Sequence, residues 1–380
     1  MTEKNVPKLR FSGFNETWVK SNLGNVSSDE MYGMNSAATD FDGFNKYIRI
    51  TDISESSNKF VPSPLTSPDG NLDEKFKLKE GDIVFARTGA STGKTYIYDK
   101  NDGNLYFAGF LIKFNINKAY PKFVFYNTLK DEYKNWVSVM SVRSGQPGIN
   151  SNEYKKLPLN IPSLDEQKKI SDFLESIDSK INLLKKKYEY YQEFKKYLMQ
   201  QIFAGKLRFD FDDEWKQYKL KDLLTVKSSS ISINQLEDNT GEYPLYGASG
   251  FLKNIDFCEM ETDYISIVKD GSGVGNLSYH EKNSSIVNTS QYLLPKKDFN
   301  IHFLYYQLQT LNLLKYVNGS SIPHIYFKDY CIEKVTVPSL PEQQKIGKLF
   351  VDTDKTIENI DNCIQVTQEF KKGLLQQMFV

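Results

Sequence analysis

The stretch IPSLDEQKKISDFLESIDSKINLLKKKYEYYQEFKKYLMQQIF at residues 161–203 decides the fold, because a second version of it occurs 176 residues later. Residues 337–379 are VPSLPEQQKIGKLFVDTDKTIENIDNCIQVTQEFKKGLLQQMF, and 18 of the 43 positions are identical without a gap. A shorter segment also recurs, LRFSGFNETW at 9–18 and LRFDFDDEW at 207–215, whereas the segments between diverge. The repeat predicts two copies of one plan, each with a short first segment, a variable body and a common tail.

Both tails begin with the pattern of a helix N-terminus. Ser163-Leu-Asp-Glu166 and Ser339-Leu-Pro-Glu342 fit a capping box, in which the serine oxygen accepts an amide hydrogen and the glutamate reaches back to the serine amide. The first helix is expected to run from Ser163 to Ala204 and to end at Gly205. Its 42 residues would make a stiff spacer of ~63 Å at ~1.5 Å per residue.

Apolar residues recur along both tails at alternating steps of three and four, which is the period of a coiled coil. Lys195 interrupts the series in the first tail, and Lys371 is one of the polar residues that interrupt the second. Basic residues dominate 180–208 and acidic residues dominate 352–369, which favours antiparallel pairing. The expected seam residues are Ile170, Leu174, Ile177, Ile181, Leu184, Tyr188, Ile346, Phe350, Ile357, Ile360 and Ile364.

The two bodies are predicted to be α+β (mixed α/β) domains with short strands. In the first body we expect strands at Lys46–Thr51, Asp82–Arg87 and Gly109–Asn115, and a helix at Phe123–Lys130. In the second we expect a strand at Asp263–Val268 and a helix at His302–Leu314. With the paired tails, this predicts two globular domains separated by two long antiparallel helices, in a pseudo-two-fold internal repeat.

The composition excludes several classes of protein. Hydrophobic residues make up 39% of the chain, and no apolar run reaches the ~20 residues of a membrane span. The N-terminal MTEKNVPKLRF lacks the apolar stretch of a signal peptide. Three scattered cysteines and three scattered histidines predict neither a disulfide framework nor a metal site. Lys+Arg and Asp+Glu are 48 each, so the whole protein is not a general polyanion binder. A soluble protein of a reducing compartment is expected.

Two glycine-rich segments invite a catalytic interpretation. Gly89–Thr95 (GASTGKT) has three residues between its glycines where a phosphate-binding loop needs four, and TYIYD follows as an expected strand rather than a helix. The related Asp270–Gly275 (DGSGVG) follows a strand in the second body. Both segments fit either a loop that closely approaches a ligand or a tight hairpin. We find no methyltransferase, hydrolase or nuclease motif, so no catalytic residue is predicted, and an ATPase or nuclease that uses GASTGKT stays an alternative.

Polar and basic residues on loops fit DNA recognition better. Arginine pairs with guanine, asparagine and glutamine pair with adenine, and lysine pairs with phosphate. For each residue taken singly, solvation or a local hydrogen bond is the more common role, but the set recurs at matched places in both bodies and as a set favours a nucleic-acid surface. The candidates are Arg49, Arg87, Lys94, Arg143, Ser144 and Gln146 in the first body, and Lys253, Lys269, Ser272, Asn276, Asn288, Gln291 and His324 in the second.

These features together resemble the DNA-specificity subunit of type I restriction-modification enzymes. The likeness rests on PSLDEQKKI and PSLPEQQKI, the paired QEFKK tails, GDIVFARTGASTGK, SGQPGIN, YPLYGASG and ISIVKDGSGVGN. The resemblance implies a first target-recognition domain at 1–160, a spacer helix at 161–205, a second target-recognition domain at 206–337 and a second spacer helix at 338–380. Each recognition domain would bind one half of a split DNA sequence, and the helices would set the gap between the halves.

The resemblance also implies partners and cofactors. The family subunit is not catalytic itself, and it recruits two modification subunits that methylate adenine with S-adenosylmethionine. Two ATP-driven restriction subunits join in the full enzyme, with Mg²⁺ expected on the partners and no cofactor on this chain. Such a host-defence complex would be cytoplasmic, without a membrane partner. A stand-alone DNA-binding or adaptor protein without a methyltransferase partner is the main alternative.

Overall fold

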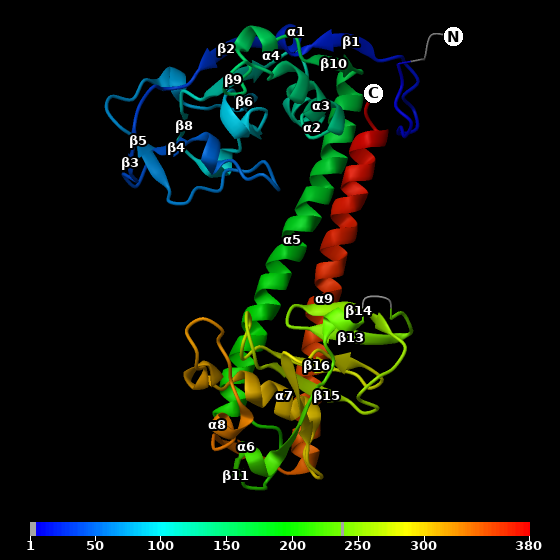
Figure 1. The fold of residues 1–380 in the computed structure, drawn as a ribbon. Helices are drawn as coiled ribbons and strands as arrows, with labels where there is room; N and C mark the ends of the chain where they lie inside the picture. Colours follow the sequence, from blue (N-terminus) through cyan, green and yellow to red (C-terminus); the bar gives the residue numbers. More distant parts are fainter. Residues whose placement is uncertain (1–4, 237–238) are drawn as a thin grey trace. The chain divides into compact units, whose positions relative to one another are not determined.

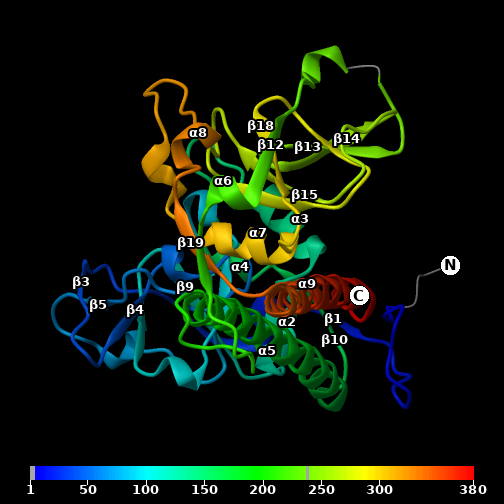
Figure 2. The same ribbon diagram turned by 90° about the horizontal axis from the view of Figure 1, so that it is seen from below.

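Two long helices, α5 (Leu164–Phe203) and α9 (Leu340–Gln377), dominate the computed structural model, which describes residues 5–236 and 239–380 (Figure 1). Asp178, early in α5, meets Lys371, late in α9, with 2.6 Å between Oδ1 and Nζ. Lys195, late in α5, meets Asp354, early in α9, at the same distance. The helices therefore run antiparallel, and Figure 2 also shows them side by side. The predicted antiparallel pair is confirmed, and α5 lies within one residue of its predicted bounds at each end.

The chain forms two compact units that each take part of both helices. One unit joins the chain up to Leu183 to Cys363–Val380, and the other spans Leu184–Asn362. The first unit thus contains the first body, the first half of α5 and the last turns of α9. The second contains the second body, the rest of α5 and most of α9.

The first unit is organised by the four-stranded antiparallel sheet β2-β9-β6-β7. All five residues of β6 (Asp82–Ala86) are buried, as is typical of a central strand. The first and last strands of the body, β1 (Val19–Asn22) and β10 (Pro158–Ile161), form a separate antiparallel pair. The other elements are α1 (Leu23–Val26), β2 (Ser27–Tyr32), β3 (Ala38–Asp40), β4 (Lys46–Ile48), β5 (Thr66–Pro68), β7 (Thr95–Ile97), β8 (Leu105–Phe107), β9 (Leu111–Ile116), α2 (Pro121–Asn127), α3 (Asp131–Met140) and α4 (Ser151–Tyr154).

The second unit repeats this plan. Its main sheet has the order β12-β18-β15-β16, which matches β2-β9-β6-β7 strand for strand, and β11-β19 matches β1-β10. The internal repeat therefore extends into the bodies, whose smaller sheets differ. The elements are β11 (Lys216–Lys219), α6 (Leu220–Leu223), β12 (Leu224–Ser228), β13 (Tyr243–Gly247), β14 (Gly250–Ile255), β15 (Tyr264–Val268), β16 (Leu277–His280), β17 (Ser285–Ile286), β18 (Ser290–Pro295), α7 (Ile301–Gln309), α8 (Phe327–Tyr330) and β19 (Lys334–Val337).

Two predicted body helices end earlier than the sequence suggested. α2 ends at Asn127 rather than Lys130, and α7 ends at Gln309 rather than Leu314. In both, the next residue is a threonine whose hydroxyl donates to the carbonyl three residues back, at 2.7 Å. Carbonyl groups in the last turn of a helix have no amide partner within the helix, and the threonine hydroxyl supplies a donor for one of them.

The predicted strand at Lys46–Thr51 is also shorter than expected. Strand β4 stops at Ile48, and a 3₁₀ turn follows at Ile50–Asp52. The Asp52 carboxylate accepts hydrogen bonds from both the backbone amide and the guanidinium of Arg49, which holds the turn.

The predicted capping boxes are wrong, because the two glutamates bind distant arginines instead. Glu166, with 2% of its side chain exposed, accepts two hydrogen bonds from Arg10 at 2.7 and 2.8 Å. Glu342, fully buried, accepts hydrogen bonds from Arg208 at 3.1 and 2.7 Å. The Ser339 hydroxyl is buried without a hydrogen-bond partner. Each helix start is therefore tied to the short segment that begins its own half of the chain.

The apolar stripes of the helices pack on the bodies as well as on each other. In the first unit, Ile170 and Leu174 share one core with Phe123 of α2 and Leu374 of α9. In the second, the core around Phe350 includes Phe303 of α7. Among the proposed seam residues, Leu184, Tyr188 and Ile357 are half-buried and the others are buried. Near the start of each long helix, the apolar stripe therefore packs against a body. The spacing of apolar residues every ~3.5 positions predicted the stripe but not this packing partner.

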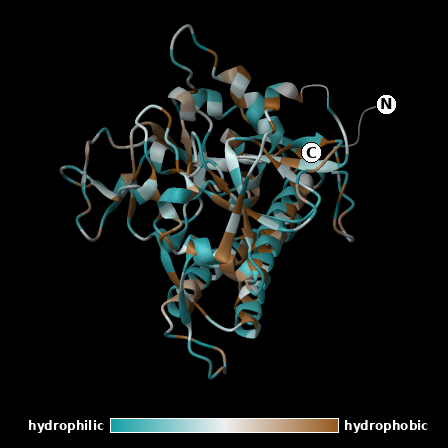
Figure 3. Cartoon of the chain, turned by 60° about the horizontal axis from the view of Figure 1, so that its bottom comes forward, coloured by the Kyte–Doolittle hydropathy of each residue, from teal (hydrophilic) through white to brown (hydrophobic). Residues whose placement is uncertain are grey.

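Polar and apolar residues alternate along both long helices (Figure 3). No helix in the described part of the chain is both long and apolar enough to cross a membrane.

Candidate nucleic-acid interface

In the first unit, the glycine-rich turn between β6 and β7 is bonded to a loop that precedes α4. Gly89 N donates to Pro147 O at 2.9 Å, and Ile149 N donates to Arg87 O at 2.9 Å. We call these two segments, residues 87–94 and 143–149, the first platform. Backbone bonds on both sides fix the turn against the loop, so its side chains are presented from a rigid base.

The second unit contains the same construction. Gly271 N donates to Pro323 O and Ile325 N donates to Lys269 O, both at 2.8 Å. Residues 269–276 and 318–325 form the second platform. The two platforms share their backbone bonds but differ in side chains, because Arg87 corresponds to Lys269 and Lys94 to Asn276.

Glycines are required at the ends of each turn. Gly89 and Gly93 have φ of +74° and +91°, and Gly271 and Gly275 have φ of +85° and +87°. A Cβ on Gly93 would also lie 2.6 Å from Val137 Cγ1, so the turn packs closely on α3. Both turns connect antiparallel strands and are therefore hairpins. The strand–loop–helix geometry of a phosphate-binding loop is not formed at GASTGKT.

The structure brings most of the predicted DNA-contact residues to these platforms. Thr289 O accepts the amides of Lys269 and Asp270, which places Asn288 and Gln291 at the border of the second platform. Arg49 and Lys253 lie elsewhere, after β4 and in β14. The first platform holds Arg87, Lys94, Arg143, Ser144 and Gln146, and the second holds Lys269, Ser272, Asn276 and His324.

Most of the basic candidates have an intramolecular acidic partner. Arg143 donates to both carboxylate oxygens of Glu153, and Arg49 donates to both oxygens of Asp52. Lys94 lies 2.9 Å from Glu55 and Lys269 lies 3.2 Å from Asp270. The hydrogen bond from Lys94 lowers the pKa of the exposed Glu55 carboxyl. DNA binding by these four side chains would replace an existing ion pair.

Arg87 is held differently, by a carbonyl and two aromatic rings that sequence analysis missed. Its Nε donates to Gly109 O at 3.0 Å. Its guanidinium carbon lies 5.0 Å from the centre of the Tyr32 ring and 6.0 Å from that of Phe110. Both rings are partly solvent-exposed, by 39% and 56%. Tyr32 is 55 positions from Arg87 in the sequence, so only the fold shows that they meet.

The histidines have local packing or loop roles. His280 is buried, and its Nε2 lies 2.9 Å from the Ser266 hydroxyl. Burial lowers the pKa of His280 to about 4, because the charged ring would lose its hydration. The His302 ring packs against the Tyr279 ring at an interplanar angle of 44°, and His324 lies in the second platform. Among the described residues, no group of three or more His, Cys, Asp or Glu side chains is placed to hold a metal ion.

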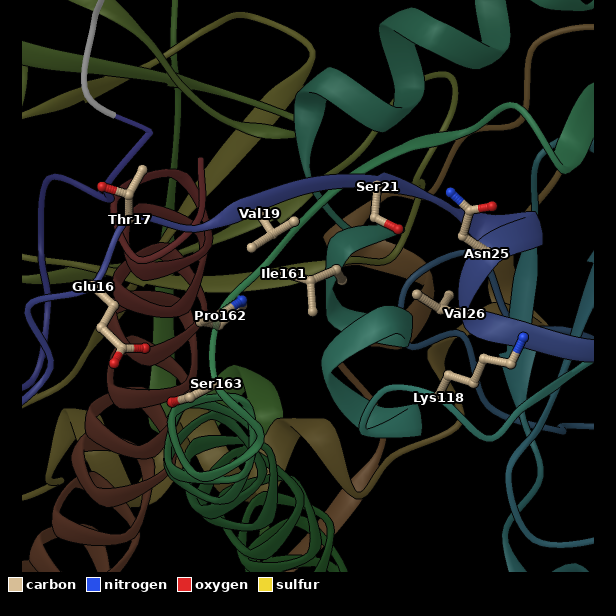
Figure 4. Close-up of a pocket in the computed structure, with 10 residues that line it drawn as sticks. All are labelled: Glu16, Thr17, Val19, Ser21, Asn25, Val26, Lys118, Ile161, Pro162 and Ser163. Atoms are coloured by element: carbon tan, nitrogen blue, oxygen red, sulfur yellow. The ribbon is translucent and has the colours of Figure 1, made fainter.

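A shallow pocket of about 380 Å³ lies beside the β1-β10 pair (Figure 4). Glu16, Ser21, Lys118 and Ser163 are among its lining residues. The predicted DNA-contact residues do not line it, so this pocket is separate from the platforms.

Comparison with known families gives one match in each half of the chain. The family model for the type I restriction modification DNA specificity domain matches residues 15–190 and 212–368.

Curated relatives of this chain have low sequence identity to it. The type I restriction enzyme MjaVIII specificity subunit of Methanocaldococcus jannaschii is 27% identical over 182 residues, which span 44% of this chain and 42% of the relative. The putative type I specificity subunit S.MpnORF507P of Mycoplasma pneumoniae is 27% identical over 53% of this chain and 56% of its own length. This chain therefore spans about half the length of these two relatives. The putative MjaX specificity subunit of M. jannaschii is 23% identical over 79% of this chain and 76% of the relative.

Two solved structures share the fold over almost the whole chain. The crystal structure of a type I restriction-modification S subunit from M. genitalium has a TM-score of 0.67 at 18% identity, and covers 99% of both chains. A chain from a study of complex assembly and conformational transition of the type I R-M system has a TM-score of 0.57 at 17% identity, and covers 97% of this chain.

Proposed function

Because the chain belongs to the type I restriction-modification DNA specificity family, we propose that it selects the DNA sequence on which such a complex acts. The observation that carries the proposal is the repeated platform, in which the same backbone bonds present different side chains. Two rigid surfaces with unlike chemistry suit the recognition of two unlike half-sites in double-stranded DNA. The target is accordingly bipartite, with one half-site for each unit.

In this proposal the chain makes and breaks no bonds. It docks two modification subunits, which bring S-adenosylmethionine and methylate adenine, and the full complex adds two restriction subunits with ATP and Mg²⁺. An internal repeat supports this stoichiometry, since a chain that imitates a two-fold dimer offers two related docking sites. The complex acts on DNA in the cytoplasm.

Exposed apolar residues on the long helices supply candidate docking faces. In the second unit, Tyr190, Phe194 and Tyr197 of α5 are 62%, 37% and 55% exposed. In the first unit, Val366 and Phe370 of α9 are 65% and 55% exposed, and they occupy the positions equivalent to Tyr190 and Phe194. Residues four apart lie on one face of a helix, and exposed aromatic groups of this kind typify protein interfaces.

Exchanging one body tests the division of the DNA target. We expect that a chain whose residues 206–337 come from a relative, expressed with the modification subunit, methylates a sequence that is altered in one half only. The reason is that the second platform lies wholly within the exchanged segment. Methylome sequencing provides the measurement, and the reciprocal exchange of 1–160 is the control that should alter the other half. A change in both halves after a single exchange would contradict the proposal.

An acidic substitution tests the docking face. The variant Phe194→Asp should bind the modification subunit roughly tenfold or more weakly, because it places a charge where an apolar anchor is needed. Gln192→Asp is the matched control, since Gln192 is an exposed polar residue of the same helix. Equal affinity of the two variants in calorimetry or pull-down titration would argue against this face.

A stand-alone DNA-binding or adaptor protein is the second candidate function. Purification of the chain from its native cells separates the two, because only the specificity subunit is expected to bring a modification subunit with it.

A further inference from the structure

We infer that Arg87 contacts a guanine in the half-site bound by the first unit, through the major groove. This inference rests on the proposed function and adds a residue and a base to it. It depends on three features of Arg87: a free donor edge, the lack of a carboxylate partner, and a fixed orientation.

Within the part of the chain that the structure describes, the hydrogen bonds of the Arg87 guanidinium leave the edge that carries its two terminal nitrogens free. Nε is occupied by Gly109 O, whereas neither terminal nitrogen of Arg87 has a hydrogen-bond acceptor among the described residues. The terminal nitrogens present parallel donors that match the O6 and N7 acceptors of guanine, a pair that the other bases do not offer. Arg87 therefore keeps the atoms that a bidentate guanine contact uses.

The lack of a carboxylate partner distinguishes Arg87 from the other three arginines of the first unit. Arg10 is bound to Glu166, Arg49 to Asp52 and Arg143 to Glu153. Within the described residues, no carboxylate lies within ion-pair distance of Arg87. A guanine contact at Arg87 thus replaces water and breaks no existing ion pair, unlike a contact by Arg49 or Arg143.

The fixed orientation comes from the surroundings. The guanidinium lies over the Tyr32 ring, with Phe110 nearby, and its own backbone carbonyl accepts the amide of Ile149. Tyr32 is itself held, because its hydroxyl accepts the amide of Ser151 at 3.1 Å. An arginine that is held at Nε and against a ring loses little further freedom on binding, and its planar guanidinium presents its donors in one plane. Base recognition needs such a fixed plane, whereas a phosphate contact does not.

In the second unit, the residue equivalent to Arg87 is a lysine, which indicates that this unit recognises its half-site through different contacts. Lys269 follows β15 as Arg87 follows β6, and it lies 3.2 Å from Asp270. An ammonium group cannot make the planar two-donor contact that a guanidinium makes. A contact of the Arg87 type is therefore confined to one half-site.

The test uses the full chain with its modification subunit in a host without adenine methylation. Long-read methylome sequencing first defines the wild-type bipartite target. The variants Arg87→Lys and Arg87→Gln should then become degenerate at one guanine position of the first half-site, with discrimination reduced about tenfold to a hundredfold. All other positions should keep their preference. Lys100→Gln is the control, because it removes one exposed positive charge from the same unit outside the first platform.

A binding measurement tests directly whether Arg87 contacts the N7 atom of a guanine. Each guanine of the first half-site is replaced in turn by 7-deazaguanine, which lacks the N7 acceptor. Wild-type complex should lose about tenfold or more in affinity at one position, and the Arg87→Gln complex should not distinguish the two bases there. This measurement on the wild-type complex alone decides the matter if the variants unfold in a thermal melt.

Several results would overturn the inference. A first half-site without guanine on either strand would do so, as would equal affinity for guanine and 7-deazaguanine at every position. Weaker methylation of an unchanged sequence in both Arg87 variants would assign the residue to phosphate contact instead. Failure of the wild-type complex to methylate any bipartite sequence would instead overturn the proposed function, and the inference with it.

Discussion

Replacing Arg10 with alanine should lower the free energy of unfolding of the first unit by about 3 kcal/mol. The guanidinium donates twice to Glu166, whose side chain is 2% exposed, and its removal leaves a buried carboxylate without a counter-ion. The loss is smaller than for a completely buried pair, because the Arg10 side chain is 14% exposed. Urea denaturation followed by tryptophan fluorescence measures the effect, since Trp18 packs in the core next to α5.

A second substitution separates the charge effect from lost packing. In the double variant Arg10→Ala with Glu166→Gln, no buried charge remains, so much of the lost stability should return. Lys8→Ala removes an exposed charge from the same segment and should leave the midpoint unchanged. An Arg10→Ala protein as stable as Lys8→Ala would contradict the role given to the pair. Arg208→Ala should act in the same direction on the second unit, because Glu342 is fully buried.

Reversing Lys371 to aspartate should destabilise the first unit by about 2 kcal/mol. Lys371 Nζ lies 2.6 Å from Asp178, and the reversal places two carboxylates together at a partly buried position between the helices. Asp178 also accepts a hydrogen bond from the Tyr126 hydroxyl at 2.9 Å, and burial with the neighbouring Asp178 charge raises the pKa of that phenol. Denaturant unfolding provides the measurement.

A variant in which both charges are reversed tests whether the effect of Lys371→Asp comes from the ion pair with Asp178. A chain with both Asp178→Lys and Lys371→Asp should recover most of the lost stability, which a double-mutant cycle expresses as a coupling energy of about 1–2 kcal/mol. Recovery should be incomplete, because Tyr126 then faces a lysine. Lys372→Asp, at an exposed position of the same helix, is the control. Additive effects of the two reversals would mean that Asp178 and Lys371 do not stabilise each other.

The long helices could be predicted because their pattern is local and occurs twice. The three–four spacing of Ile170, Leu174 and Ile177 indicates a helical apolar face wherever that face packs. What it packs against could not be predicted, since Phe123 and Leu374 reach the same core only through the fold. The capping boxes failed for a related reason: in place of a hydrogen bond from the nearby Ser163 amide, the Glu166 carboxylate accepts a charge-assisted bond from Arg10, 156 positions away.

The candidate site shows the same division. Residue type and repeated loop position led to Arg87, Gln146 and Lys269 as candidates, and the structure places all three on the platforms. The pairing of each glycine turn with a second loop was not predicted, because it depends on backbone bonds such as Gly89 to Pro147. The partners of the basic residues were also beyond the sequence pattern. Glu55 and Lys94, or Tyr32 and Arg87, are neighbours in space only.

The first unit is built from two separate segments of the chain, and this has a consequence for synthesis on the ribosome. Its core contains Trp18 and Phe123 together with Leu374, Leu375 and Met378 from the far end of the chain. The second unit is one continuous segment, Leu184–Asn362, and needs nothing translated later. The half that is made first must therefore wait, partly uncovered, for the last turns of α9 to emerge. A nascent chain that stops before those turns leaves the aromatic core of its first unit open, where chaperones and proteases can detect it.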